Sequence, residues 1–189
     1  MSGRSLVSLI DSVLGWRSRS CGAVSVGQGA TIAWRRIRRV AGNHLSIGNE
    51  SIIHADISFE ERGGEVRIGS RTFIGRSNLV CYRKLIIGDD VIMSWGVTIV
   101  DHDSHSIDWT KRRNDVTEWG RGCKAWDNVA HAPVTIADKV WIGFNVSVLK
   151  GVTIEEGAVV GACSVVTRDI PAYSLAAGNP ARVIRTLRR

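Results

Sequence analysis

Aliphatic residues recur at every sixth position along most of the chain. From Val134 onward the recurrence is unbroken, and a second, mostly small or apolar residue stands two positions before each member. The first set is Ile136, Ile142, Val148, Ile154, Val160 and Val166; the second is Val134, Val140, Val146, Val152, Ala158 and Ser164. A helix repeats every 3.6 residues and an ordinary strand every 2.0, so neither explains this period. The pattern predicts six-residue units with one bend in each.

The same frame continues upstream in groups of three. Its apolar positions are Ile47, Ile53, Phe59, Ile68, Ile74, Val80, Ile87, Met93 and Ile99. Val26 and Ile32 begin a partial coil, which we expect the arginines of residues 35–39 to interrupt. Three units per group predict three flat sides, each a short strand with its aliphatic residue pointing to the axis. We therefore expect an all-β solenoid of about five complete triangular coils, stacked about 4.8 Å apart.

One long segment, residues 100–133, breaks the frame between Ile99 and Ile136. It contains His102, His105 and His131, and also Trp109, Trp119 and Trp126. The side of a solenoid is flat, and a loop of this length is uncommon unless it has a function of its own. The segment is therefore the predicted location of the chemistry. Its tryptophans are expected either to pack the insertion or to stack on a sugar ring at an acceptor site, together with His131.

The insertion opens with Asp101-His102-Asp103-Ser104-His105. A carboxylate beside an imidazole fixes the tautomer of the ring, so that the histidine can act as a general base. Either His105 or His102 is the candidate base, and either Asp103 or Asp101 is the candidate orienting acid. A plain turn held by side-chain hydrogen bonds is the structural alternative. A zinc site built from His102, His105 and His131 is another alternative.

Three motifs together resemble those of a known family. They are the I-G-x-x-x-x-like hexads in triplets, the D-x-D-x-H turn at residues 101–105, and Ala177-Gly178-Asn179-Pro180-Ala181-Arg182-Val183-Ile184-Arg185. The chain resembles the hexapeptide-repeat acyltransferases over about residues 24–185, and within them the sugar and polysaccharide O-acetyltransferase branch. The resemblance implies a left-handed parallel β-helix, acetyl-coenzyme A as donor, and a homotrimer with sites between subunits. In that turn the family's catalytic histidine matches His105.

The resemblance also implies a donor site. Its residues would be Trp141, Gly143, Gly161, Ala162, Thr167, Arg168, Pro171, Arg182 and Arg185. Coenzyme A is long and carries several phosphate charges, so it needs an extended groove and cations at its nucleotide end. Small residues at the corners would let the backbone approach the cofactor closely. No metal is expected.

Composition and charge narrow the function further. The chain has 189 residues, 44% of them hydrophobic, and no apolar run long enough to cross a bilayer. The net charge of +7 comes from two patches, the arginines of 35–39 and those of 168–189. Such patches suit small phosphorylated ligands better than a nucleic-acid duplex. The first patch either engages an anionic, lipid-linked sugar or remains solvated.

The expected organisation is an amphipathic helix in residues 1–20, a β-helix domain in 21–185 with the insertion at 100–133, and a basic tail in 186–189. Four scattered cysteines and no secretory signal favour a cytoplasmic protein, with at most peripheral membrane contact. The predicted function is acetylation of a saccharide hydroxyl in surface-polysaccharide or lipopolysaccharide assembly. An N-acetyltransferase acting on an amino sugar or antibiotic, a non-catalytic scaffold and a zinc-binding β-helix are the alternatives.

Overall fold

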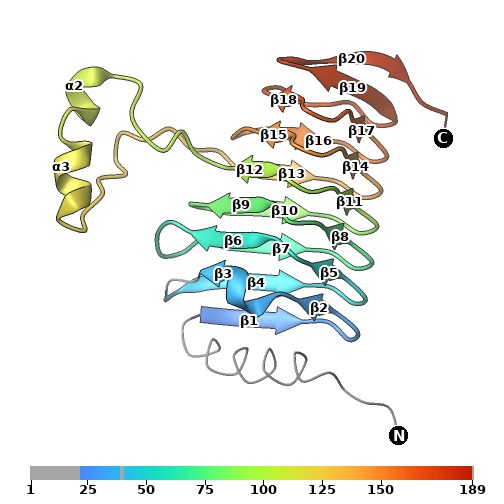
Figure 1. Ribbon diagram of the computed structural model, residues 1–189, viewed down its shortest axis with the longest axis horizontal. Coiled ribbons are helices and arrows are strands. Elements are labelled where there is room, and N and C mark those ends of the chain that lie inside the picture. Colours follow the sequence, from blue (N-terminus) through green and yellow to red (C-terminus); the bar gives the residue numbers. More distant parts are fainter. Residues whose placement is uncertain (1–21, 39–40, 189) are drawn as a thin grey trace, which may run out of the picture.

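The computed structural model describes residues 22–38 and 41–188. The predicted N-terminal helix lies outside these residues. Within them the chain winds as a β-helix whose strands stack into three parallel sheets, A, B and C (Figure 1). Sheet A contains β1 (Gly22–Val26), β4 (Asn43–Ile47), β7 (Glu65–Ile68), β10 (Lys84–Ile87), β13 (Val134–Ile136) and β16 (Thr153–Ile154). The predicted fold class, a triangular β-solenoid, is confirmed.

The other two sheets close the triangle. Sheet B contains β2 (Thr31–Ile32), β5 (Ile52–Ile53), β8 (Phe73–Ile74), β11 (Ile92–Met93), β14 (Trp141–Ile142), β17 (Val159–Val160), β19 (Ser174–Gly178) and β20 (Ala181–Thr186). Sheet C contains β3 (Ile37–Arg38), β6 (Asp56–Phe59), β9 (Asn78–Cys81), β12 (Thr98–Val100), β15 (Ser147–Val148) and β18 (Val165–Val166). β20 pairs antiparallel with β19, whereas the other strand pairs are parallel.

The six-residue frame predicts most of the core. In sheet B the inward column runs through Ile53, Ile74, Met93 and Ile142, each fully buried. The second set, from Val134 to Ser164, is also buried throughout. Burying such aliphatic side chains contributes roughly 1.5–3 kcal/mol each, which makes the axis the main source of stability.

On sheet C the six-residue frame predicts the wrong inward residue in two coils. Leu79, and not Val80, is the fully buried residue that pairs in register with Ile99. In the coil before it, Ile57 occupies the same column, while Phe59 is buried two residues further on and pairs with Cys81. The connections before these strands are shorter than in later coils, so the inward position moves toward the N-terminus.

The count of about five coils is also too low. Sheets A and C each contain six strands among the described residues, and β19 adds a seventh parallel strand to sheet B. Arg35 and Arg36 do not interrupt the first coil, because they lie in the short 3-10 helix η2 (Trp34–Arg36) between β2 and β3, and Arg38 belongs to β3. Val26 is 42% exposed and is not part of the buried core.

The corners between sheets determine which residues of successive coils lie next to one another. We call them the A–B, B–C and C–A corners, after the sheets that they connect. Glycines often follow the inward aliphatic residue at the A–B and B–C corners. A Cβ on Gly69 would come within 2.5 Å of the backbone carbon of Gly88, so coil stacking requires glycine there. The left-handed backbone angle at the A–B corner belongs mostly to other residues, such as Arg71 and Asp90.

The insertion leaves the C–A corner as an arm. The chain departs after β12, forms α2 (Trp109–Arg112) and α3 (Asp115–Gly120), and returns at β13. In Figure 1 the two helices lie well to the side of the stacked coils, joined to them by two extended segments. None of the helices in the described part of the chain has the length and apolar character needed to cross a bilayer.

Candidate functional site

His105 and Asp115 form a histidine–carboxylate pair on the arm. The His105 Nδ1 atom lies 2.5 Å from Asp115 Oδ2, and both side chains are partly exposed. Asp115 is the first residue of α3, so the helix brings it back against the loop that carries the histidine. When Nδ1–H donates to the carboxylate, the lone pair of Nε2 is left to accept a proton. This is the tautomer that a general base requires.

The surroundings of His105 leave room for a ligand. An open depression of about 560 Å³ is lined by Asp103, His105, Ser106, Ile107 and Arg112. The Trp119 ring meets the imidazole edge-on, with centroids 5.4 Å apart. Arg112 donates to the carbonyl oxygens of Ser106 and Ile107 and so fixes the rim of the depression. The histidine therefore sits at a surface that an acceptor can reach.

The two expected orienting acids have other partners. Asp101 is fully buried, and its carboxylate accepts hydrogen bonds from the backbone N–H groups of Tyr82, Arg83 and Lys84 at 2.6–2.7 Å. Asp103 forms an ion pair with Lys150 at 2.7 Å. Neither carboxylate has a hydrogen bond to His105. The acid that contacts the candidate base is Asp115, which was not among the predicted acids.

The hydrogen bond at Nδ1 of His102 favours a different tautomer from that of His105. Its Nδ1 accepts a hydrogen bond from the backbone N–H of Ser104 at 2.9 Å, so the proton of the neutral ring must be on Nε2. That Nε2 is buried and has no hydrogen-bond partner among the described residues. The ring meets Trp126 edge-on, with centroids 5.1 Å apart. In this arrangement His102 is a proton donor and not a base.

Burial lowers the pKa of His102, and this effect outweighs the negative charge of Asp101, which raises it. A histidine that is harder to protonate when folded than when unfolded stabilises the fold above its unfolded pKa of about 6.5. We predict that the free energy of unfolding decreases as the pH falls below about 6.5, because the unfolded chain then binds the additional proton. Denaturant titrations between pH 8 and pH 5 measure this. His102→Gln should flatten the dependence, whereas an unchanged profile in that variant would assign the effect to other groups.

Trp126 and Tyr82 hold the returning segment of the arm against the coils. Their rings stack with centroids 4.1 Å apart and an interplanar angle of 18°. Trp126 is only 8% exposed and, with Val129, forms a small core of its own beside Tyr82. The Nζ atom of Lys124 lies over the Trp126 ring, 4.0 Å from its centroid. Trp126 therefore packs the insertion, which was one of its two expected roles.

The other expected acceptor residues are more open. Trp109 is 64% exposed with Arg112 at its face, and Trp119 is 53% exposed beside His105. His131 is exposed, forms an isolated bridge with His102, and has Nδ1 3.2 Å from the Val129 carbonyl oxygen. The three histidines do not converge on one point, and the described residues contain no group of three His, Cys, Asp or Glu side chains able to hold a metal.

The expected donor residues do not form one cavity within a single chain. Trp141, on sheet B, leads into the B–C corner that carries Gly143, Gly161 and Ala162. Thr167 and Arg168 lie at the C–A corner, Pro171 lies near the A–B corner, and Arg182 and Arg185 are on β20 at the end of the solenoid.

The small size of two donor-site candidates has a structural explanation. A Cβ on Gly143 would lie 2.6 Å from the backbone nitrogen of Ala162, and one on Gly161 would lie 2.9 Å from the Ala177 side chain. The neighbouring coil therefore occupies the space beside each glycine. Coil stacking is therefore sufficient to require glycine at these two positions.

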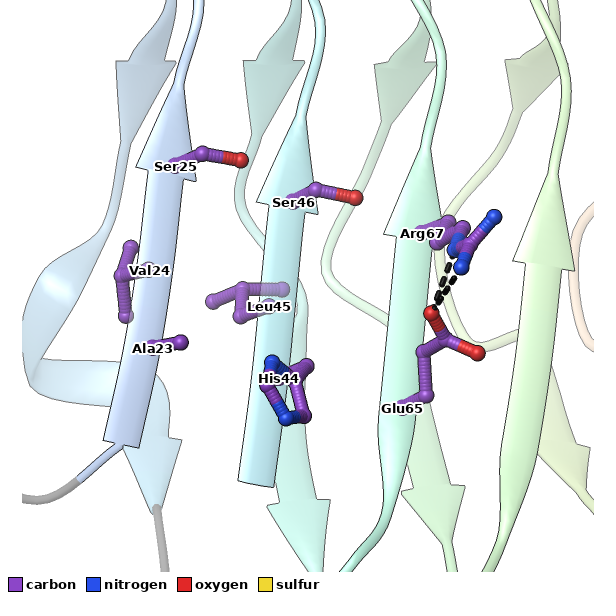
Figure 2. Close-up of a pocket in the computed structure, with 8 residues that line it drawn as sticks. All are labelled: Ala23, Val24, Ser25, His44, Leu45, Ser46, Glu65 and Arg67. Carbon is purple, nitrogen blue, oxygen red and sulfur yellow. Dashed lines mark hydrogen bonds and ion pairs between the residues drawn. The ribbon is translucent and has the colours of Figure 1, made fainter. Parts of the chain in front are cut away.

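A second depression lies on the outer face of sheet A, across β1, β4 and β7 (Figure 2). His44 and the Glu65–Arg67 ion pair line it, and Glu65 also pairs with Lys84 at 3.2 Å. Glu65 is paired with these two cations, and no hydrogen bond or ion pair joins it to His44. The arm remains the better candidate for catalysis.

Comparisons with known proteins agree with the fold described above. Residues 133–168 match the bacterial transferase hexapeptide family model, which consists of six repeats. The Mycobacterium tuberculosis protein named "Probable acetyltransferase Rv3034c" is 34% identical over 145 residues. That match covers 76% of this chain but only 43% of the relative, so the chain spans less than half of that protein's length.

Two solved structures share the fold over most of the chain. The polySia specific acetyltransferase NeuO superposes with a TM-score of 0.64 and 27% identity, covering 88% of this chain and 67% of that one. A maltose O-acetyltransferase from Clostridium difficile 630 superposes with a TM-score of 0.56 and 25% identity, covering 100% and 80%. Together the matches show that the chain is similar to hexapeptide-repeat acetyltransferases and shares their β-helix fold.

Proposed function

We propose that the protein transfers the acetyl group of acetyl-coenzyme A to a saccharide hydroxyl, with His105 as general base. The observation that carries the proposal is the His105–Asp115 pair at an open depression on the arm. The similarity to proteins named as acetyltransferases supplies the donor class. Two of the similar structures are named for saccharide acceptors, polySia and maltose, which supports the acceptor class.

The proposed reaction is a direct transfer. Nε2 of His105 takes the proton of the acceptor hydroxyl while the hydroxyl oxygen bonds to the thioester carbonyl carbon. Asp115 stabilises the imidazolium that forms. A backbone N–H stabilises the negative charge on the carbonyl oxygen. The carbon–sulfur bond then breaks, and the coenzyme A thiolate leaves and receives the proton. No cysteine nucleophile is needed for this reaction. Cys81 is buried, and burial is the largest cause that raises the pKa of its thiol.

The active assembly in this proposal is a homotrimer with sites between subunits. Within one chain the arm leaves the C–A corner, whereas Trp141 and Ala162 lie on sheet B and the B–C corner. A neighbouring copy brings the two together. The outer face of sheet B also offers a continuous apolar column for such a contact. Its members Ile52, Phe73, Ile92 and Trp141 are paired in register and are 38–54% exposed.

The proposed setting is the assembly of a surface polysaccharide or lipopolysaccharide on the cytoplasmic side of the membrane. Three free cysteines in the described residues suit a reducing compartment. This setting also gives the enzyme access to acetyl-coenzyme A.

The test is an acceptor screen that follows thiol release from acetyl-coenzyme A. We expect release with saccharides that carry hydroxyl groups but no amino group, and a product ester that mild alkali cleaves. An alkali-stable amide formed with amino sugars alone would identify an N-acetyltransferase. Donor binding without release for any acceptor, neutral, acidic or amino, would contradict the saccharide class.

A further inference from the structure

We propose that the acceptor is a negatively charged saccharide and that the B–C corner of the first five coils binds it. Its anionic groups lie against Arg35 and Arg76, and its sugar rings lie against Trp95 and Phe144. This inference rests on the proposed function, because it names the acceptor class of that reaction.

The residues involved form a ridge along one corner of the solenoid. The backbone N–H of Gly96 donates to the Arg76 carbonyl at 2.6 Å, and that of Asn145 donates to the Trp95 carbonyl at 3.0 Å. Arg76, Trp95 and Phe144 therefore stand on three successive coils of one corner. Arg35 stands two coils before Arg76, at the same corner. At about 4.8 Å per coil the ridge extends over roughly 19 Å, which is longer than a single sugar ring.

Charge is segregated between corners. The B–C segments, residues 33–36, 54–55, 75–77, 94–97, 143–146 and 161–164, contain three arginines and no acid. The A–B segments, residues 27–30, 48–51, 69–72, 88–91, 137–140, 155–158 and 171–173, contain six acids against two bases. An anionic ligand is therefore attracted to one corner and repelled by another.

The fold uses the acids but not all of the arginines. At the A–B corner, Asp89 accepts from the backbone N–H of Ser70, and Asp138 accepts from that of Asp89, so these acids connect neighbouring coils. At the B–C corner Arg36 pairs with Asp56 at 2.6 Å. Arg35 and Arg76 are exposed, and their guanidinium groups have no hydrogen bond or ion pair among the described residues. Both guanidinium groups are thus available to a ligand.

The aromatic pair beside them is open to solvent. Trp95 and Phe144 stack with an interplanar angle of 6° and centroids 5.3 Å apart, and they are 62% and 39% exposed. Two large exposed rings outside the core suit a ligand that has both an apolar face and polar edges. A sugar ring has this character. Cations followed by aromatic rings along one edge therefore fit an acidic saccharide better than a neutral one.

The experiment measures binding to the full-length chain without catalysis. The probes are oligogalacturonate, which carries carboxylates, UDP-N-acetylglucosamine, which carries phosphates, and neutral maltoheptaose. We expect one or both anionic probes to bind more tightly than maltoheptaose, and the stronger of them identifies the anion. Arg35→Gln with Arg76→Gln should weaken that binding about tenfold and reduce its salt dependence. The matched control, Arg62→Gln with Arg188→Gln, removes the same charge elsewhere and should stay within twofold.

Equal binding of neutral and anionic probes, or equal losses in the two double variants, would overturn the proposal. Trp95→Ala should weaken saccharide binding while the sedimentation coefficient stays unchanged. Dissociation of the assembly with binding intact would instead make the aromatic pair a subunit contact. An acetyl-coenzyme A titration on the same samples separates the two claims. Lost donor binding speaks against the proposed function, whereas a failed saccharide result with donor binding intact speaks only against the ridge.

Discussion

Replacing His105 by Gln is expected to lower turnover by about 10²–10⁴-fold while leaving donor affinity unchanged. Glutamine keeps the approximate size and polarity of the side chain but cannot accept and release the proton at Nε2. Because the histidine lies on the arm and not in the solenoid core, the fold should remain intact. Steady-state thiol release gives the rate, and calorimetry with acetyl-coenzyme A gives the affinity.

Two companion variants make this test specific. Asp115→Asn removes the charge that holds the Nδ1 proton, 2.5 Å away, and should reduce turnover because the ring loses its fixed tautomer. His102→Gln should retain far more activity than His105→Gln, because the His102 Nδ1 is occupied by the Ser104 N–H. Loss of turnover in His102→Gln with near-normal activity in His105→Gln would move the base to His102.

Replacing Asp101 by Asn should cost about 3 kcal/mol of unfolding free energy. The buried carboxylate accepts three backbone N–H groups, and an amide can offer only one oxygen while its NH₂ group faces donors. These bonds fix the start of the arm to the preceding coil, so turnover should fall as well. Urea unfolding measures the stability directly.

The matched control for Asp101 is Asp103→Asn, two residues along the same turn. The Asp103→Asn variant loses only a partly exposed ion pair with Lys150. This loss is expected to change the free energy of unfolding by less than about 1 kcal/mol. Equal stabilities of the two variants would show that the Asp101 hydrogen bonds do not fix the arm.

The six-residue period predicted the solenoid because a single geometric requirement repeats along the chain. Each inward aliphatic residue stacks on its equivalent one coil away, so the pattern at Ile136, Ile142 and Val148 reports the structure directly. The prediction failed at Val80, where the corner before β9 is shorter and Leu79 turns inward. Corner length depends on local backbone angles, which a count of six does not encode.

The candidate site was only partly predictable from sequence, because one of its two residues depends on how the arm folds. His105 could be selected from its carboxylate-rich turn and its place at the start of the insertion. Asp115 is ten residues away, and it reaches the histidine only because the arm folds into two short helices. The signal available in the sequence was only a further carboxylate within the same insertion. The role of Asp101 could not be inferred, since its partners are backbone groups of another coil.

Titration of the purified protein with acetyl-coenzyme A by calorimetry tests directly whether the protein binds the donor, because it needs no knowledge of the acceptor. We expect saturable binding with about one site per chain in the wild type and in His105→Gln alike. Absence of binding at millimolar donor would contradict the assignment as an acetyl-coenzyme A-dependent transferase.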